Sequence, residues 1–255
     1  MQTVLFHETV FGPIHSRRLG SSLGVNLSPR DGKVCSFDCL YCEAGFNAQG
    51  TGTTGLPSRP EVASLLRARL ESMRAAGEPL DVITFSGNGE PTLHPEFEEI
   101  VGDVIALRDE FYPDVKISVL TNSTRLDSEA VCRALERVDN NILKLDSAVE
   151  ETMRRLDRPT SKSFTVARVV EQLKRFASTG VIQTMIVRGD GVDNTTDAEI
   201  SALIEAYRAI RPRSIMIYSI DRKTPDELLR KVGRDELEAI AARIASAVQL
   251  PVSVS

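Results

Sequence analysis

Long apolar runs are missing from this chain of 255 residues. No stretch approaches the roughly 18 consecutive apolar residues that a membrane-spanning helix needs. The opening segment, Met1–Glu8, also lacks the charged-then-apolar layout of a secretion signal. We therefore expect a cytoplasmic protein that does not use a membrane.

An excess of positive charge is missing as well. The formal net charge is −5 and the isoelectric point is about 5.4. A dedicated nucleic-acid binder usually presents a basic surface, so this balance disfavours one, although a local basic patch stays open. With 42% hydrophobic and 26% charged residues, the composition is that of an ordinary globular protein long enough to bury a core.

Cysteine is scarce and unevenly distributed. The chain has four cysteines, and three of them, Cys35, Cys39 and Cys42, fall within eight residues. Three thiols this close cannot all pair off in disulfides, and no secretion signal places them in an oxidising compartment. The spacing therefore indicates a metal centre in a reducing environment.

Two kinds of metal centre use thiolate ligands. A structural zinc ion normally takes four ligands, and the remaining cysteine, Cys132, lies inside a helical pattern where an inert buried thiol is the commoner role. Spaced cysteines also hold iron–sulfur clusters, and three ligands on a four-iron cluster leave one iron free to bind another molecule. The spacing favours a [4Fe–4S] site, with zinc or purely structural thiols as the alternatives.

Strand and helix patterns alternate along most of the chain. The predicted strands cover residues 23–27, 81–86, 115–121, 141–146, 181–187 and 214–220. Helical periodicity follows each strand, and Ser58 (with Glu61 in a capping box) and Asp127 mark helix starts. About six strand–helix units in alternation predict a parallel sheet with helices outside it.

We predict one domain over residues 1–255. It comprises an N-terminal extension (1–22), a barrel core (23–220), and C-terminal helices with an edge strand (221–255). The C-terminal helices are expected to begin at Thr224 and near Gly233. Six units are too few for a closed barrel of ~250 residues, so we expect an α/β fold, an open partial barrel of the TIM type. The cysteine loop follows the first strand, at the edge where βα loops build active sites.

Glycines and polar side chains mark the same edge after other strands. The segment Ser86-Gly87-Asn88-Gly89-Glu90 follows the second strand, where glycines let the backbone approach a ligand and Glu90 places an acceptor. Asn122 and Ser123 follow the third strand and could reach a cofactor or a substrate. Ordinary turns would also explain both segments.

Charged residues on the remaining strands are further candidates. Lys144 and Asp146 share one face of the fourth strand, an arrangement that is costly unless the charges are paired or functional. Lys144 could pair with Asp146, meet the substrate, or form a Schiff base with a carbonyl. Gln183 and Arg188 could face the substrate, and Arg17 could meet a phosphate or a carboxylate.

The C-x3-C-x2-C spacing, with Tyr41 before the last cysteine, resembles the radical S-adenosylmethionine (radical SAM) superfamily when taken together with Phe85–Leu93. The resemblance covers nearly the whole chain. It implies a partial (β/α)6 barrel, a [4Fe–4S] cluster on the three cysteines, and S-adenosylmethionine chelated to the free iron. The cofactor contacts that it implies come from Tyr41, Ser86, Gly87, Asn88, Gly89, Glu90, Asn122, Ser123, Asp146 and Tyr218. Asn88 departs from the glycine more common at its position in the family.

The resemblance also implies a reaction. The reduced cluster donates an electron to S-adenosylmethionine, whose carbon–sulfur bond breaks to give methionine and a 5′-deoxyadenosyl radical. That radical abstracts hydrogen from a substrate held in the barrel. A reducing partner such as flavodoxin or ferredoxin is part of this expectation.

The substrate stays open among small molecules, peptides and RNA. Segments 16–20, 85–93, 144–146 and 218–222 look most like the wyosine-forming tRNA enzymes. Those enzymes hold a second cluster on cysteines upstream of the motif, and no cysteine precedes Cys35 in this sequence. A different class is a non-enzymatic iron–sulfur electron-transfer or sensor protein, which would need neither the Gly87–Pro91 loop nor an enclosing barrel.

Overall fold

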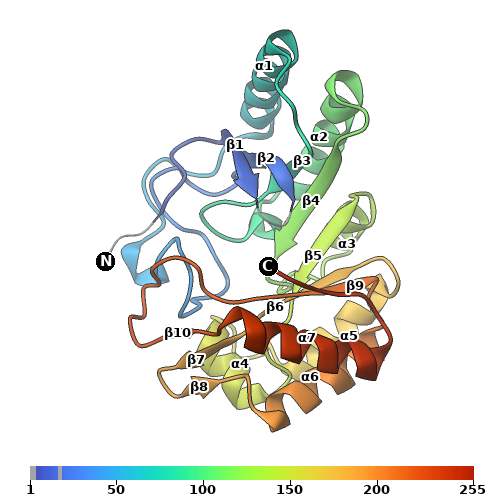
Figure 1. Ribbon diagram of the computed structural model, residues 1–255. Helices are drawn as coiled ribbons and strands as arrows, with labels where there is room; N and C mark the ends of the chain where they lie inside the picture. The colour runs from blue at the N-terminus through green and yellow to red at the C-terminus, as the bar shows by residue number, and fades with distance from the viewer. Residues whose placement is uncertain (1–3, 17–18) are drawn as a thin grey trace.

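A curved eight-stranded sheet forms the centre of the computed structural model, which describes residues 4–16 and 19–255 (Figure 1). Its strand order is β1-β2-β3-β4-β5-β6-β9-β11. The strands span β1 (Val10–Ser16), β2 (Gly20–Val25), β3 (Val82–Phe85), β4 (Lys116–Thr121), β5 (Asn140–Lys144), β6 (Val181–Met185), β9 (Ser214–Tyr218) and β11 (Val252–Val254). Neighbours from β2 to β11 pair in parallel, and β1 pairs antiparallel with β2.

Helices connect the parallel strands and lie on the outer side of the curved sheet (Figure 1). They are α1 (Arg59–Ala76), α2 (Phe97–Phe111), α3 (Glu129–Glu136), α4 (Glu150–Asp157), α5 (Val166–Leu173), α6 (Asp197–Ile210) and α7 (Arg234–Val248). Short 3-10 turns occur at Asn47–Gln49, Pro91–Leu93 and Lys174–Phe176. The predicted α/β partial barrel is confirmed, and the C-terminal segment adds the expected edge strand.

Helix starts follow local side-chain chemistry. Ser58 caps α1 as predicted, because its side chain accepts a hydrogen bond from the backbone of Glu61. The prediction that Asp127 caps α3 is wrong by one residue, since Ser128 accepts from the amide of Val131. Either side chain could satisfy the free amides of a helix start, so sequence alone does not decide between them.

The helix expected at Thr224 is wrong. The Asp226 carboxylate accepts from the amide of Leu228 at 2.8 Å and makes a turn. The chain then continues as β10 (Arg230–Lys231), which pairs antiparallel with β7 (Val187–Gly189). With β8 (Val192–Asp193), these strands form a second, small sheet. Pairing with a distant strand overrides the local helix signal here.

One main apolar core lies between the sheet and the helices. Strand residues such as Ile83, Ile117 and Ile215 are fully buried, as are the helix residues Leu66 and Ile100. Parallel pairing with this core behind it brings the carboxyl ends of seven strands to one edge, where Val25 lies beside Phe85 and Lys144 beside Gln183. That edge carries the candidate site.

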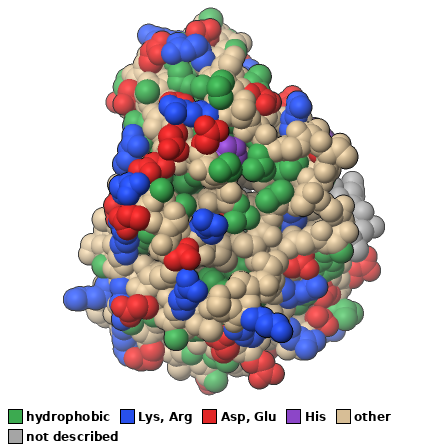
Figure 2. Space-filling view, turned by 180° about the vertical axis from the view of Figure 1, so that it is seen from behind, with side chains coloured by type: hydrophobic (Ala, Val, Ile, Leu, Met, Phe, Trp, Pro, Cys, Tyr) green, Lys and Arg blue, Asp and Glu red, His purple; other side chains and the backbone are tan. Residues whose placement is uncertain are grey.

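Charged side chains of both signs are spread over the face of the molecule shown in Figure 2. On the face seen in Figure 2, basic and acidic side chains are interspersed, without a broad field of one sign. Among the described residues, no helix is both long enough and apolar enough to cross a membrane.

Candidate functional site

The cysteine loop is fastened to the carboxyl end of α4. The amide of Leu40 donates to the carbonyl of Leu156 at 3.0 Å, and the amide of Asp38 donates to the carbonyl of Asp157 at 3.1 Å. Within the loop, the amide of Cys42 donates to the carbonyl of Cys39 at 3.2 Å. These bonds hold the thiols in place because they tie the loop to a regular element rather than leaving it to solvent.

The glycine-rich loop after β3 packs against the segment that leads into the cysteines. Gly89 bridges to Val34, whose carbonyl accepts from the amide of Glu90 at 2.9 Å. Gly89 has φ +155°, and a Cβ there would lie 1.9 Å from the Val34 oxygen. A Cβ on Gly87 would lie 2.4 Å from Oδ1 of Asn26. These glycines therefore make room for the chain itself, and their contact with a ligand stays a prediction.

Asn88 has a structural task that the sequence did not reveal. Its Nδ2 donates to the carbonyls of Phe6 at 2.8 Å and Pro29 at 2.9 Å, and its Oδ1 accepts from the amide of Phe6 at 2.8 Å. The side chain is fully buried. The Asn88 amide thus anchors the N-terminal segment, and the cofactor contact expected at Asn88 stays a prediction.

Glu90 is the hub of a buried hydrogen-bond network. Its carboxylate accepts from the amide and hydroxyl of Thr92, from the hydroxyl of Thr121 at 2.6 Å and from the amide of Asn122 at 2.6 Å. Burial raises the pKa of Glu90, and these hydrogen bonds oppose the shift. Glu90 thereby joins the ends of β3 and β4 beneath the cysteine loop.

Asn122 links that network to the cysteines. Its Nδ2 lies 3.6 Å from Sγ of Cys35 and 2.9 Å from Oγ of Ser36. Its Oδ1 accepts from the hydroxyl of Thr124 at 2.7 Å, which fixes the orientation of the amide. Ser123, at φ +66°, turns away and its hydroxyl donates to the carbonyl of Lys144. Of these two predicted residues, Asn122 alone contacts a cysteine.

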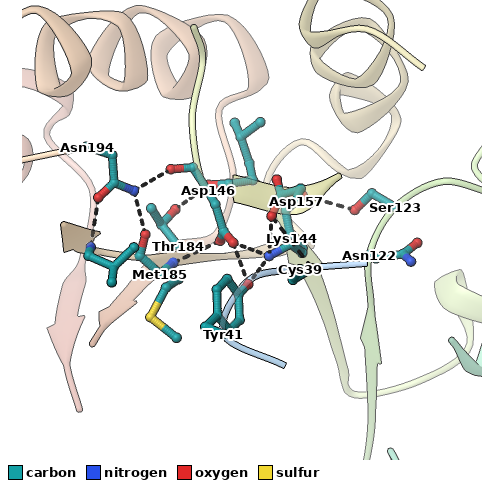
Figure 3. Close-up of polar contacts among 12 residues, drawn as sticks. Cys39, Tyr41, Asn122, Ser123, Lys144, Asp146, Asp157, Thr184, Met185 and Asn194 are labelled. Carbon is teal, nitrogen blue, oxygen red and sulfur yellow. Dashed lines mark hydrogen bonds and ion pairs between the residues drawn. The ribbon is translucent and has the colours of Figure 1, made fainter. Parts of the chain in front are cut away.

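A compact group of charges lies on the other side of the cysteine loop (Figure 3). Nζ of Lys144 forms ion pairs with Asp146 and with Asp157, the latter at 2.9 Å, and contacts the hydroxyl of Tyr41. That hydroxyl donates to Asp146, whose other oxygen accepts from the amide of Met185 at 2.8 Å. The Lys144 and Asp146 pairing considered from the sequence is present, and Asp157 completes it.

The electrostatics of this group follow from burial. Burial alone would lower the pKa of Lys144, but Asp146 and Asp157 raise it well above its usual value. Burial raises the pKa of Asp157, and Lys144 opposes that shift. The two carboxylates thus favour the protonated amine of Lys144, whereas a Schiff base needs a neutral amine. Lys144, Asp146 and Asp157 thus form a buried cluster in which opposite charges compensate one another.

Asp157 is a site residue that sequence reasoning missed. Sγ of Cys39 donates to its carboxylate at 3.8 Å, which connects the cysteine loop to Lys144. Asp157 ends α4, where the helix dipole disfavours a carboxylate. An acidic residue at a helix carboxyl end, directly before Arg158 and Pro159, was the signal that could have drawn attention to it.

The cysteine cavity, about 320 Å³ in volume, opens beside the cysteine loop. Its walls include Cys39, Cys42, Tyr41, Lys144 and Tyr218. A second space, the barrel cavity, has a volume of about 150 Å³ and lies inside the curve of the sheet. Ser86 lines the barrel cavity, and Gln183 lines both. Much of the predicted set therefore meets around two adjoining spaces.

Two predicted residues fall elsewhere. Arg188 donates to Glu236 on α7 at 2.6 Å and to the hydroxyl of Thr195 at 2.5 Å, and it lines neither cavity. The expectation that Arg188 faces the substrate is corrected, because its guanidinium forms an ion pair with the surface carboxylate of Glu236 on α7. Arg17 lies outside the described residues.

The donor set at the cysteine loop fits a cluster better than a single ion. Cys132 is buried in the core and donates to the carbonyl of Leu126, so it is no fourth ligand. Within residues 4–16 and 19–255, no group of three or more His, Cys, Asp or Glu is arranged around one metal-ion position. Zinc needs such a convergence, with ligands at about 2.0–2.3 Å, whereas each thiolate of an iron–sulfur cluster binds a different iron.

The thiols are set in a protected environment. Burial raises the pKa of Cys35 to about 11, with the charge of Glu90 adding to the shift. Burial also raises the pKa of Cys39 well above its usual value, against the effect of Lys144. Thiolates are disfavoured here until positive charge compensates them, which bound iron would supply.

Residues 31–207 match the family model described as the Radical SAM superfamily. The chain belongs to this superfamily. The resemblance predicted from the cysteine and glycine motifs is thereby confirmed, and membership implies a [4Fe–4S] cluster and S-adenosylmethionine as cofactors.

The chain is also similar to individual proteins and solved structures. A UPF0026 protein of Helicobacter pylori (strain ATCC 700392 / 26695) is 31% identical over 231 residues, which is 89% of this chain and 71% of that protein. A radical SAM methyltransferase from Sphaerobacter thermophilus has a TM-score of 0.68 at 18% identity, over 92% of this chain and 65% of that one. TYW1 with a lysine-pyruvate adduct bound has a TM-score of 0.60 at 16% identity, over 90% of this chain and 75% of that one. The two solved structures establish a shared fold, and this chain spans less than two thirds of the methyltransferase.

Proposed function

We propose that this chain is a radical SAM enzyme in which Cys35, Cys39 and Cys42 hold the [4Fe–4S] cluster and the cysteine cavity holds S-adenosylmethionine. The observation that carries the proposal is the position of Cys39 and Cys42 in the wall of a 320 Å³ cavity at the carboxyl ends of the strands. A cofactor in that cavity would lie directly against the thiol-bearing loop. When bound, the cluster and S-adenosylmethionine supply one-electron cleavage of the carbon–sulfur bond and hydrogen abstraction from a substrate.

The protein's own residues bind, orient and enclose. Tyr41 presents its ring to the cavity, and the bond from its hydroxyl to Asp146 fixes the ring's position. Tyr218 and Met185 supply further apolar surface in the same wall. Such walls exclude water, which protects a reactive radical from side reactions. The positive charge of Lys144 offsets the charges of the buried Asp146 and Asp157 carboxylates beside the cofactor.

Asn122 has a separate task in this proposal. Hydrogen bonds to cluster sulfurs are among the factors that set a cluster's reduction potential. Nδ2 of Asn122 lies 3.6 Å from Sγ of Cys35, so a hydrogen bond from this amide would help to set the reduction potential of the cluster. Reduction itself requires an outside donor, and a flavodoxin or a ferredoxin in the cytoplasm is the partner we propose.

The test is spectroscopic. The protein is purified without oxygen, reduced with dithionite, and measured by electron spin resonance with and without S-adenosylmethionine. We expect the cofactor to change the reduced-cluster signal and 5′-deoxyadenosine to be released. Cys39→Ala should lose the cluster, whereas Cys132→Ala, which removes the buried core thiol, should keep it.

The opposite outcome is equally clear. If S-adenosylmethionine leaves the signal unchanged and no 5′-deoxyadenosine forms, the enzyme proposal fails and an electron-transfer or sensor protein takes its place. If the protein shows no iron–sulfur absorption, the cluster proposal fails as well.

A further inference from the structure

Lys33 is a buried cation at the start of the cysteine loop. Its side chain is 2% exposed, and its Nζ donates to the carbonyl of Gly45 at 2.7 Å. Its own amide donates to the carbonyl of Gly50 at 3.1 Å. Lys33 and Gly45 flank the three cysteines in the sequence, so this side chain ties the start of the cysteine loop to its end.

Asp38 offsets the charge of Lys33 only in part. Its Oδ1 lies 4.0 Å from Nζ of Lys33, which is the outer limit of an ion pair. The same carboxylate pairs with Arg158 at 3.0 Å and accepts from the amide of Asn47 at 2.6 Å. Because two cations share one carboxylate, this group retains a positive charge beside the cysteine loop.

Lys144 provides a contrast on the other side of the same loop. It forms ion pairs with the buried carboxylates of Asp146 and Asp157, so its charge is already offset. Burial of an ammonium is costly unless a nearby anion compensates it. An additional anion would therefore be stabilised more strongly beside Lys33 than beside Lys144.

The cysteines can supply that negative charge. Burial and the charge of Glu90 raise the pKa of the Cys35 thiol, and the charge of Lys33 opposes them. Each thiolate that binds iron carries a negative charge, and reduction of the cluster adds another. The net charge around an iron–sulfur cluster is one of the factors that set its reduction potential.

We propose that the buried ammonium of Lys33 raises the reduction potential of the cluster that the three cysteines hold. The inference rests on the proposed function and gives Lys33 a role distinct from that of Asn122, which acts through a hydrogen bond. In the reduction step, one electron passes from an outside donor to the cluster, the donor is oxidised, and no proton is transferred. The ammonium attracts the more negative, reduced state more strongly, so it favours reduction.

A redox titration of the cluster-loaded protein tests the proposal. Lys33→Met removes the charge and keeps the length of the side chain. At a fixed applied potential, without S-adenosylmethionine, electron spin resonance gives the ratio of reduced to oxidised cluster. We expect this ratio to fall by roughly tenfold, which is about 59 mV for a one-electron couple. Asp38→Asn removes a negative charge from the same group and should raise the ratio by roughly threefold.

Lys174→Met is the matched control, because it removes the same charge from the surface. Lys174 is 43% exposed and pairs with Glu171 at the end of α5. Solvent and salt screen a charge in that position. The ratio of reduced to oxidised cluster should therefore change by less than about twofold.

The sign of the change separates an effect of charge from structural support alone. A loosened loop would admit water, which also stabilises the reduced state, so loss of support would raise the ratio in Lys33→Met. An unchanged or raised ratio in that variant overturns the inference, and a lowered ratio supports it. If Lys33→Met does not retain a cluster, Asp38→Asn decides: a raised ratio supports the inference, and an unchanged or lowered ratio overturns it.

The same samples keep this inference apart from the proposed function. If S-adenosylmethionine leaves the wild-type signal unchanged but Lys33→Met and Asp38→Asn shift the ratio in opposite directions, the enzyme proposal fails and the role of Lys33 stands. If the signal responds to S-adenosylmethionine but neither variant shifts the ratio, the proposed function stands and the role of Lys33 is overturned.

Discussion

At the scale of single residues, the site depends on buried charges that compensate one another. Lys144 is 14% exposed, Asp146 1% and Asp157 3% at their side chains. Such groups are strongly coupled, because removal of one partner leaves the others uncompensated in a poorly solvating interior. The same residues hold Tyr41 and Cys39 in place, so their charge balance and the geometry of the cofactor cavity are linked.

Lys144→Met tests this coupling. We expect the free energy of unfolding to fall by about 3–5 kcal/mol, because two carboxylates lose their buried cation. Burial already raises the pKa of Asp157, and a carboxyl with a raised folded pKa contributes stability at low pH and loses it as pH rises. The pKa of Asp157 is raised to about 8 even though Lys144 opposes the shift, so loss of Lys144 raises it further, and the deficit of the variant should grow as pH rises above about 8. Urea denaturation at several pH values measures it.

Arg133→Met is the control for that measurement. Arg133 is 52% exposed and pairs with Glu98 on the surface, so its loss should cost about 1 kcal/mol or less. A similarly small effect of Lys144→Met would contradict the idea that Lys144 compensates the buried charges of Asp146 and Asp157.

At the scale of elements, a loop near the site does two jobs. The glycine-rich loop after β3 supports the cysteine loop through Val34 and holds the N-terminal segment through Asn88. That segment covers the barrel cavity with Phe6 and Phe11. The same short loop, at Asn88 and Gly89, therefore both supports the cysteine loop and holds the segment that covers the barrel cavity.

Asn88→Leu should release the cover. Its side-chain bonds to Phe6 and Pro29 disappear, and each buried bond is worth about 1 kcal/mol. Amide exchange at Phe6 should speed up by roughly tenfold or more, as measured by hydrogen–deuterium exchange with mass spectrometry.

Asn140→Leu is a control for the Asn88 variant. The Asn140 side chain bonds to Ser118 and Arg213, away from the N-terminal segment. It should leave exchange in residues 4–16 unchanged. Unchanged exchange in Asn88→Leu would mean that the cover does not depend on Asn88.

At the scale of the whole molecule, charge distribution bears on the substrate. The formal net charge is −5, and the face in Figure 2 mixes both signs. Phosphate contacts dominate nucleic-acid affinity, and the face in Figure 2 has no broad basic field to supply them. The wyosine-type alternative, suggested by several sequence segments, would need a basic path for RNA.

Retention of tRNA tests that alternative. We expect the cluster-loaded protein to release bulk tRNA at physiological salt, because nonspecific binding of a few phosphate contacts is lost steeply as salt rises. Filter binding from about 50 to 200 mM salt measures this. Saturable retention at the upper end would revive the tRNA-modifying enzyme as the leading function.

Much of the fold followed from the sequence because the signals were local. β-branched runs and helical periodicity predicted six strand–helix units, and parallel pairing followed from their alternation. The helix expected at Thr224 failed because pairing of β10 with β7 is a contact between distant segments. A local pattern carries no information about which remote strand competes for the same backbone.

The sequence by itself determined the cluster-type thiol triad, the family and the order of the elements, because spacing and periodicity are properties of neighbouring residues. Tertiary structure alone decided the roles of Asn88, Asp157 and Gln183. Asn88 anchors the N-terminal segment from far along the chain, Asp157 joins Cys39 to Lys144, and Gln183 lies in the walls of both cavities. Each role depends on which groups folding brings within about 3–4 Å and which it removes from water, and neither quantity is encoded in local spacing.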